Sequence, residues 1–210
     1  MLFKPTWFWN VMARGYARRP VQNPEAYQYK LDATAAQLTP RDRVLEFGCG
    51  TGTTALIHAP KVAQIDAIDF SSEMIAIAKE KAQTQGVTNV NFDQARFEDW
   101  PVPVAGQGYD AVLGMSVLHL VGDLQATLLR VRKSLKPGGL FFSSTACLGD
   151  SGGIARFMLP PLGAIGILPK LTHLTAKSLI RTIESNGFDV EHSWRPSETA
   201  GIFVIARRTD

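Results

Sequence analysis

The sequence predicts one α/β domain built around a mostly parallel sheet. The chain has 210 residues and 23.0 kDa, a length at which a single domain buries roughly 70% of its unfolded surface. Residues 43–52 read RVLEFGCGTG, in which a short apolar run typical of a buried strand breaks into glycines two positions apart. Similar apolar runs follow, separated by helical patterns, and this alternation is typical of parallel sheets covered by helices.

The composition is that of an ordinary soluble protein, with 45% hydrophobic and 20% charged residues. The net charge of +3 does not indicate a nucleic-acid partner, because the basic residues are spread along the chain without an aromatic stacking motif. Cys49 and Cys147 lack the number and spacing of a disulfide framework or a metal site, which favours a reducing, cytoplasmic location. No secretory signal is evident, although the acid-free first 24 residues leave an organelle transit peptide as an alternative.

The N-terminal region, residues 1–40, is predicted to contain a flap followed by a helix. Its first 22 residues carry aromatic side chains outside a regular pattern, which suggests a segment that covers something apolar: Phe3, Trp7, Phe8, Trp9 and Tyr16. Asn23 and Pro24 are residue types expected at an N-cap and at a first helical position. Helical spacing of apolar residues then extends this helix to Leu38.

The same signals predict the other elements. Strands are expected at 44–47, 62–68, 87–92, 109–115 and 140–144, and helices at 72–86, 124–135 and 175–186. Two last strands, 188–194 and 202–206, are expected to pair antiparallel at one edge of the sheet. The basic residues near the helix 124–135 are expected to be solvated: Arg130, Arg132, Lys133 and Lys136.

The glycine turn after the first strand indicates a binding site. Glycine adopts positive φ and lets a ligand lie against bare backbone, while the following helix start supplies unpaired N–H groups. A dinucleotide-binding fingerprint would place Gly or Ala where Thr53 stands. Glu46, just before the turn, would face a pyrophosphate unfavourably, whereas it suits a ligand with an ammonium or sulfonium group.

Asp69 is the second candidate ligand. It ends the strand 62–68, 17 positions beyond Gly52. In α/β nucleotide folds this spacing places a carboxylate where it can accept hydrogen bonds from both ribose hydroxyls. The alternative is that Asp69 is the N-cap of the next helix, although Ser71 and Ser72 are also suitable caps.

The ExGxGxG pattern of Glu46, Gly48, Gly50 and Gly52 resembles motif I of the class I S-adenosylmethionine-dependent methyltransferases. The resemblance covers about residues 44–145 and includes the YDAVLGM strand and the LKPGGLF turn. It is to the small-molecule type, in particular to the group resembling ubiquinone and menaquinone biosynthesis enzymes. It implies a Rossmann-like, doubly wound, seven-stranded sheet with an antiparallel edge strand in a three-layer αβα sandwich.

The resemblance also implies S-adenosylmethionine as cofactor, S-adenosylhomocysteine as product, and no metal. Glu46 would lie near the methionine amino group, Met115 near the thioether, and Phe70 and Phe97 beside adenine. Arg96 stands where the family often has an acid that contacts the adenine amino group, which leaves that contact open. The expected cofactor contacts are Glu46, Gly48, Cys49, Gly50, Gly52, Asp69, Phe70, Ser71, Met74, Arg96, Phe97, Glu98 and Met115.

Two residues are candidates for catalysis. His119 follows the strand 109–115 and could be a general base or orient a substrate; the alternative is a packed or capping residue. Tyr16 resembles a tyrosine that closes over the cofactor in small-molecule methyltransferases, and the alternative is an aromatic anchor for the flap.

Residues 147–173 form an apolar segment broken by prolines and glycines, which makes it a poor membrane helix. It resembles the family's substrate lid, and a dimer contact or surface packing is the alternative. The domain is therefore divided into 1–40, a cofactor-binding core at 43–145, the lid at 147–173, and the C-terminal helix and strands at 175–210.

The predicted function is methyl transfer to a small apolar acceptor. The alternatives are a non-catalytic module that binds S-adenosylmethionine, and an NAD-dependent oxidoreductase. No nucleic-acid partner is expected, while peripheral membrane contact and a dimer remain open.

Overall fold

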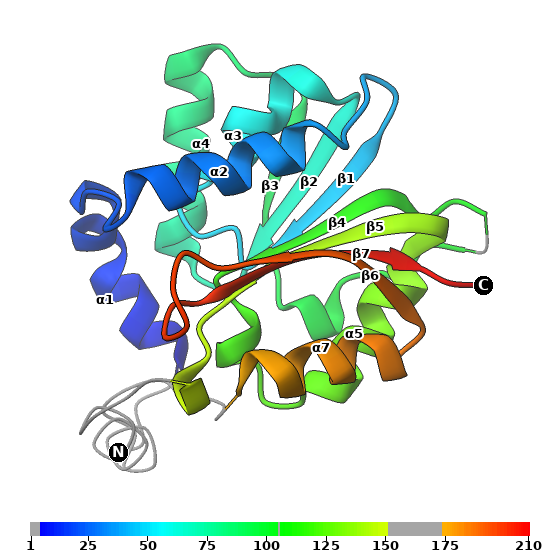
Figure 1. Ribbon diagram of the computed structural model, residues 1–210. Coiled ribbons are helices and arrows are strands. Elements are labelled where there is room, and N and C mark those ends of the chain that lie inside the picture. The colour runs from blue at the N-terminus through cyan, green and yellow to red at the C-terminus, as the bar shows by residue number, and fades with distance from the viewer. Residues whose placement is uncertain (1–4, 105, 151–173) are drawn as a thin grey trace.

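The protein is a three-layer sandwich around one seven-stranded sheet (Figure 1). The computed structural model describes residues 5–104, 106–150 and 174–210. The strand order is β3-β2-β1-β4-β5-β7-β6, and β7 runs antiparallel to both of its neighbours. The strands are β1 Arg43–Phe47, β2 Gln64–Asp69, β3 Val90–Gln94, β4 Tyr109–Met115, β5 Leu135–Thr145, β6 Phe188–Trp194 and β7 Ile202–Arg208.

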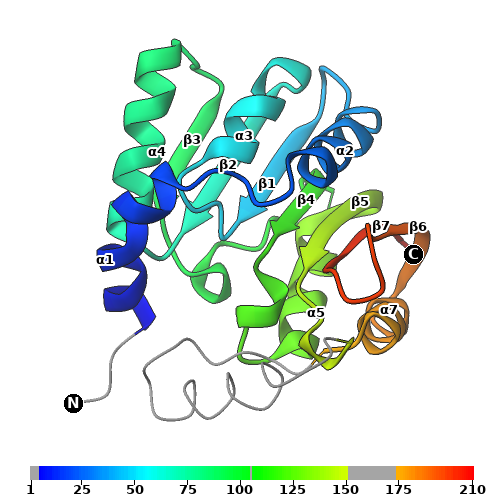
Figure 2. The same cartoon turned by 60° about the vertical axis from the view of Figure 1, so that its left-hand side comes forward.

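Helices cover both faces of the sheet, as Figures 1 and 2 show. They are α1 Pro5–Arg18, α2 Pro24–Ala35, α3 Thr53–His58, α4 Ser72–Gln85, α5 Leu124–Ser134 and α7 Ala176–Ser185. One core cluster packs residues of α3 and α4 against the sheet, and a second packs residues of α5 and α7 against the opposite face. Strands buried on both faces explain why the sequence shows continuous apolar runs here.

The strand order creates the crevice in which a ligand can bind. From β1 the chain moves outward to β2 and β3, then returns to the other side of β1 to form β4. The helices that follow β1 and β4 therefore lie on opposite faces, which leaves a gap at the carboxyl ends of these two strands. This topological switch point is the usual ligand site of open α/β sheets.

The predicted fold class is confirmed, and several local predictions are confirmed as well. The Asn23 Oδ1 atom accepts a hydrogen bond from the Ala26 amide at 2.9 Å, so Asn23 caps α2. The terminal strands β6 and β7 pair antiparallel, with β6 at the edge and β7 between β5 and β6. The second strand starts at Gln64 rather than at residue 62, because 59–61 form a 3-10 helix containing Pro60.

The N-terminal segment is more regular than its sequence suggests. Residues 5–18, expected as an irregular flap, form α1, which packs against α4. Ala13 is fully buried, and the Asn10 Oδ1 atom accepts a hydrogen bond from the Ser71 hydroxyl at 2.6 Å. The expected lid at 147–173 lies outside the described residues except for its first four, 147–150. Among the helices that are described, none has the length and hydropathy needed to cross a membrane.

His58 is expected to destabilise the protein at acidic pH. Its side chain is 1% exposed, and neither ring nitrogen has a hydrogen-bond partner in the described structure. Burial lowers the pKa of His58 from 6.5 to about 4. Between these values the unfolded state binds the proton and the folded state does not, so the free energy of unfolding falls by about 3 kcal/mol as pH drops from 6.5 to 4.

The test is urea unfolding of the wild type and of His58→Met at pH 7 and at pH 4.5. Methionine fills a similar volume and does not titrate, so the variant should lose less stability on acidification than the wild type. Equal losses in the two proteins would contradict the role of His58. Other titrating groups, including Glu46, are common to both proteins and cancel in the comparison.

Candidate functional site

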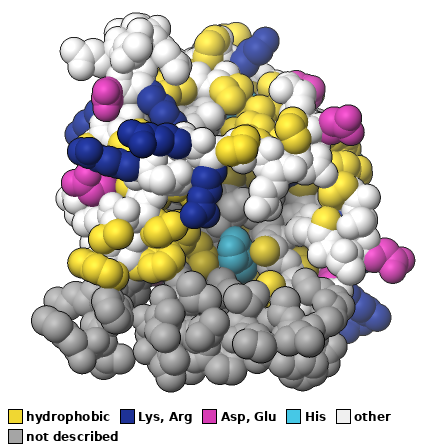
Figure 3. Space-filling view, turned by 90° about the vertical axis from the view of Figure 1, so that its left-hand side faces the viewer, with side chains coloured by type: hydrophobic (Ala, Val, Ile, Leu, Met, Phe, Trp, Pro, Cys, Tyr) yellow, Lys and Arg dark blue, Asp and Glu magenta, His cyan; other side chains and the backbone are white. Residues whose placement is uncertain are grey.

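A cleft of about 1290 Å³ lies at the carboxyl ends of β1, β2, β4 and β5. Residues of α1 and α2 line it from outside the sheet, and Figure 3 shows the surface hollowed there with apolar side chains gathered near the opening. All the expected cofactor contacts line this cleft except Gly52 and Ser71. Both catalytic candidates, His119 and Tyr16, line it too. Among these predicted residues, Tyr16 and His119 are the furthest apart in the sequence, at 103 positions, and the structure places both on one cleft.

The three glycines of the turn have positive φ angles and different surroundings. A Cβ atom at Gly48 would lie 2.7 Å from the Val117 side chain, and one at Gly52 would lie 2.7 Å from the Phe92 ring. At Gly50, where φ is 55°, a Cβ atom would meet no described heavy atom within 4 Å. Gly48 and Gly52 thus permit close packing, whereas Gly50 presents open backbone to the cleft.

Glu46 is a buried carboxyl group with an unused acceptor. Its side chain is 2% exposed, and Oε2 has no hydrogen-bond partner among the residues described. Burial, followed by the nearby charge of Asp69, raises the pKa of Glu46 to about 8. A cation bound in the cleft would favour the ionised form and remove much of this cost. Glu46 is therefore suited to bind an ammonium group.

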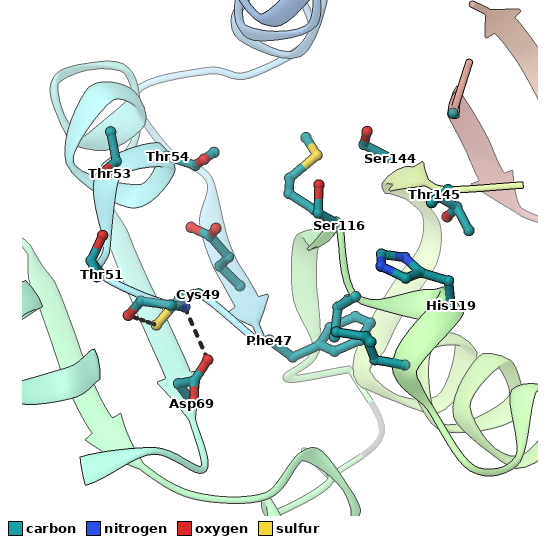
Figure 4. A pocket seen from close by; sticks show the side chains of 18 of the residues that line it. Phe47, Cys49, Thr51, Thr53, Thr54, Asp69, Ser116, His119, Ser144 and Thr145 are labelled. Atoms are coloured by element: carbon teal, nitrogen blue, oxygen red, sulfur yellow. Dashed lines mark hydrogen bonds between the residues drawn. The ribbon is translucent and has the colours of Figure 1, made fainter. Parts of the chain in front are cut away.

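Asp69 is held at the glycine turn by two backbone amides. Oδ2 accepts from the Gly50 amide at 3.0 Å (Figure 4), and Oδ1 accepts from the Ser71 amide at 2.9 Å. Burial raises its pKa, and the two hydrogen bonds oppose this shift. Ser71, not Asp69, is the N-cap of α4, since its Oγ accepts from the Met74 amide at 3.2 Å. Asp69 keeps unused lone pairs on a carboxylate that lines the cleft.

The loop that follows β3 closes one end of the cleft. The Phe97 ring stacks on Phe47 with centroids 4.2 Å apart, and the Arg96 guanidinium lies 5.6 Å from the centroid of Phe70. Phe70, Arg96, Phe97, Glu98 and Met74 all line this end. An Arg96–Phe70 pair at this position offers flat surfaces against which a planar ring could pack.

Arg130 holds this loop in place, a role that its sequence position did not reveal. Its Nε donates to the Phe97 carbonyl at 2.5 Å, a second guanidinium N–H donates to the Trp100 carbonyl, and the guanidinium lies 5.7 Å from the Phe97 ring centroid. The prediction that Arg130 is solvated was wrong. Helical periodicity placed it on the outer side of α5, but only the folded chain shows that the 97–100 backbone passes there.

The end of β4 carries local backbone strain beside the cleft. Ser116 is the one non-glycine residue with positive φ in the described structure, at 58°, and its amide donates to the Ser144 carbonyl at 2.7 Å. Such strain persists when the surrounding structure enforces it, and it is common near functional sites. Met115 and Ser116 both line the cleft, but no sequence signal identified Ser116 as unusual.

The two catalytic candidates lie on different walls of the cleft. His119 follows β4 in a short 3-10 helix, and its Nδ1 is buried without a partner in the described chain. Burial lowers the pKa of His119, so the imidazole is neutral and able to accept a proton at pH 7. Tyr16 lies near the end of α1, is 47% exposed, and contacts Trp9 edge to face with centroids 6.3 Å apart.

Three further residues line the cleft that sequence patterns did not single out. The Tyr27 hydroxyl lies 3.5 Å from the Thr54 Oγ1, and the Lys30 Nζ donates to the Ser144 Oγ at 3.2 Å. Trp194, at the end of β6, packs against Tyr29 with ring centroids 4.1 Å apart. These contacts join elements distant in sequence, so local pattern could not reveal them.

Residues 38–195 match the family described as "Methyltransferase domain". The chain belongs to this methyltransferase family. The match spans β1 to β6 and includes every residue expected to contact the cofactor. No group of three or more His, Cys, Asp or Glu side chains that could hold a metal ion occurs in the described part of the domain.

Several relatives of this methyltransferase domain are named as O-methyltransferases. It is 35% identical over 148 residues to the ubiquinone biosynthesis O-methyltransferase of Xanthomonas axonopodis pv. citri, covering 69% of this chain and 59% of the relative. It is 32% identical over 164 residues to the ubiquinone biosynthesis O-methyltransferase of Escherichia coli O6:H1, covering 76% of this chain and 65% of the relative. It is 37% identical over 105 residues to the malonyl-[acyl-carrier protein] O-methyltransferase of Bacillus cytotoxicus, covering 49% and 35%. The domain thus spans between 35% and 65% of these relatives.

Solved structures share the fold of this methyltransferase domain. YcgJ from Bacillus subtilis superposes with a TM-score of 0.68 at 17% identity, covering 87% of this chain and 99% of that one. An S-adenosylmethionine-dependent methyltransferase from Mesorhizobium loti superposes with a TM-score of 0.70 at 20% identity, covering 87% of this chain and 98% of that one. The [4+2]-cyclase SpnF superposes with a TM-score of 0.70 at 19% identity, covering 91% of this chain and 85% of that one. At these identities the likeness shows the fold alone, and the inclusion of a cyclase illustrates why.

Proposed function

We propose that this chain binds S-adenosylmethionine and transfers its methyl group to a small acceptor. The observation that carries the proposal is the buried Glu46 carboxyl group, whose Oε2 has no partner among the described residues and which lies beside the open Gly50 backbone. Leaving a carboxyl group desolvated is costly unless a cation or donor joins it on binding. Family membership supports the same proposal.

The residues of the cleft fit the parts of this cofactor. Glu46 would bind the methionine ammonium, and the Gly50 backbone would lie against the amino-acid portion. Asp69 would accept from the ribose hydroxyls with the lone pairs that the two amides leave free. Phe70 and the Arg96–Glu98 loop would hold the adenine, and Met115 would lie near the sulfur.

S-adenosylmethionine supplies a methyl group on a positively charged sulfur, which an acceptor nucleophile can displace in line. The chain's main contribution is then alignment of the two reactants and exclusion of water. Aromatic residues of α1 that line the cleft, Phe8, Trp9 and Tyr16, are suited to exclude water. His119, neutral at pH 7, would accept the proton of an acceptor hydroxyl. The acceptor's apolar part would contact apolar side chains that line the cleft, such as Trp194.

The test begins with calorimetric titration of S-adenosylmethionine, S-adenosylhomocysteine and NAD. The first two should bind and NAD should not; the reverse would favour an oxidoreductase and overturn the proposal. Incubation with a panel of small hydroxylated acceptors follows, with release of S-adenosylhomocysteine as the readout. Turnover with any acceptor excludes a non-catalytic binding module, which tight cofactor binding alone does not.

We also propose a reducing, cytoplasmic location, since Cys49 and Cys147 are both buried and unpaired.

Replacing Asp69 by Ala is expected to weaken S-adenosylhomocysteine binding by about 1.5 to 3 kcal/mol, the range for charged hydrogen bonds. Because Asp69 also holds the Gly50 and Ser71 amides, Asp69→Asn is the matched variant that keeps one acceptor oxygen. It should lose less affinity than Asp69→Ala. Calorimetry measures both, and thermal unfolding checks that the turn is intact. Unchanged affinity in the Ala variant would remove Asp69 from the site.

A further inference from the structure

The cleft extends beyond the half assigned to the cofactor. The sheet order β2-β1-β4-β5 places the ends of these strands side by side, so Asp69, Glu46, Met115 and Ser144 follow one another across the cleft. Adjacent strands lie about 4.8 Å apart, and Ser144 pairs with Met115 in the sheet. Figure 4 shows Ser144 and Thr145 on the side of the cleft opposite Cys49 and Asp69. This far side is where an acceptor would bind.

Helix α2 contacts both halves of the cleft through different residues. Tyr27 reaches Thr54, at the start of the helix that follows the glycine turn, while Lys30, one turn further, reaches Ser144 on β5. Lys30 therefore lies over the acceptor half. Its position three residues from Tyr27 on the same helix explains how both side chains point toward the sheet.

Lys30 places a poorly compensated positive charge in this half. Its Nζ donates to the Ser144 hydroxyl at 3.2 Å, and no carboxylate of the described residues lies within 4.0 Å of it. Burial lowers the pKa of Lys30, and no acidic group contributes to offset this shift. Partly desolvating an ammonium group against one neutral hydroxyl is unfavourable, and an anionic oxygen would relieve it.

The residues beside Lys30 decide what this half of the cleft can bind. Ser144 is 8% exposed and lines the cleft. Thr145, the next residue of β5, also lines the cleft, but successive side chains of a strand point to opposite faces, so its hydroxyl lies away from Lys30. The Lys30 ammonium and the Ser144 hydroxyl thus lie together as hydrogen-bond donors. Ser144 pairs with Phe203, which pairs with Trp194, so Trp194 offers apolar surface on the same face of the sheet.

We propose that the acceptor is an amphipathic carboxylic acid whose carboxylate binds Lys30 and Ser144, with its apolar body against Trp194. This rests on the proposed function and adds to it the charge of the substrate. Lys30 is then a specificity-determining residue. The distance of this subsite from Met115, about one strand spacing, leaves room for the reacting group of the acceptor near the methyl donor.

The experiment uses a matched pair of probes, 3-phenylpropanoate and 3-phenylpropanamide, which differ in charge and little in shape. Each is titrated calorimetrically into the full chain, with and without saturating S-adenosylhomocysteine. The wild type should bind the carboxylate at least tenfold more tightly than the amide. Equal affinities, or binding of neither probe, overturn the proposal.

Variants assign the preference to Lys30. Lys30→Met should bring the two affinities within twofold, and Lys30→Arg should keep most of the preference. Lys133→Met is the matched control, because Lys133 is an exposed lysine of α5 outside the cleft, and its preference should equal that of the wild type. A preference that persists in Lys30→Met overturns the proposal.

Affinity for S-adenosylhomocysteine, measured in the same variants, separates this proposal from the function. Lys30→Met should change it less than twofold. A larger loss would mean that Lys30 binds the cofactor's own carboxylate, which overturns the acceptor subsite and leaves the proposed function intact. If the wild type does not bind S-adenosylhomocysteine, the proposed function fails, and the titrations without it still report the carboxylate preference.

Discussion

Glu46→Gln is expected to weaken S-adenosylmethionine binding by about 10- to 100-fold. The substitution keeps the size of the side chain and removes the charge that would pair with the methionine ammonium. Charged hydrogen bonds contribute roughly 1.5 to 3 kcal/mol, which corresponds to this range. Calorimetric titration of the wild type and the variant measures the effect. An unchanged affinity would mean that Glu46 does not contact the cofactor.

The same variant should abolish a pH dependence of binding. In the free protein the pKa of Glu46 is raised to about 8, so the group is protonated at pH 7, and a bound ammonium would favour its ionised form. Binding should therefore release protons at pH 7, and affinity should increase as pH rises toward 8. Titrations in buffers of different ionisation enthalpy measure this release in the wild type, and Glu46→Gln should show none from this group.

Stability provides the control for Glu46→Gln. The unfolded carboxyl group ionises near pH 4.5 and the folded one near 8, so the folded state binds the extra proton in this window. The wild type consequently loses stability from this group as pH rises from 4.5 to 8. Glutamine does not titrate, so the variant should be more stable relative to the wild type at pH 8 than at pH 5. Loss of binding together with a lower melting temperature at pH 8 would indicate misfolding instead.

Gly52→Ala is expected to destabilise the fold by about 2 to 5 kcal/mol. The φ angle of 74° costs a non-glycine residue about 1 to 2 kcal/mol. The added Cβ would also lie 2.7 Å from the Phe92 ring and 2.8 Å from the Ala78 Cβ, and overpacking of this kind costs roughly 1 to 3 kcal/mol. Urea unfolding measures the change in the free energy of unfolding.

Gly50→Ala is the matched comparison. Its φ of 55° imposes a similar conformational cost, but the added Cβ meets no described atom within 4 Å. It should therefore lose only about 1 to 2 kcal/mol of stability and lose cofactor affinity instead, because the methyl group would project into the cleft. Equal destabilisation of the two variants would show that packing against Phe92 does not explain the glycine at position 52.

Much of the fold was predictable because its signals are local. An apolar run that ends in glycines predicts β1 and its turn, and Asn23 before Pro24 predicts the start of α2; the structure confirms both. The fold class follows from the order of such signals, and the family follows from the resemblance of the motifs at residues 46–52 and 135–141. The second strand began later than predicted because a 3-10 helix at 59–61 precedes it, which the apolar pattern did not show.

The candidate site was predictable only in part. Glu46, Gly50 and Asp69 were named from the spacing of charged residues and glycines around two strand ends, and the structure places all three on one cleft. Their role as cofactor contacts stays a prediction. Ser71 and Gly52 lie behind the cleft wall, Ser71 as the cap of α4 and Gly52 against Phe92. Side-chain direction, rather than position in the motif, decides which residues a ligand can reach.

The sequence by itself determined the backbone conformations that neighbouring residues enforce: the buried strands, the glycine turn and the helix caps. It also carried the motifs whose resemblance indicates the family. The tertiary structure alone decided which distant groups meet. Lys30 and Ser144 are 114 residues apart, and Arg130 and Phe97 are 33 apart. It also decided how much water each group loses, which raises the pKa of Glu46 and lowers that of His58. Local conformation depends on adjacent residues, whereas desolvation depends on everything packed around a group.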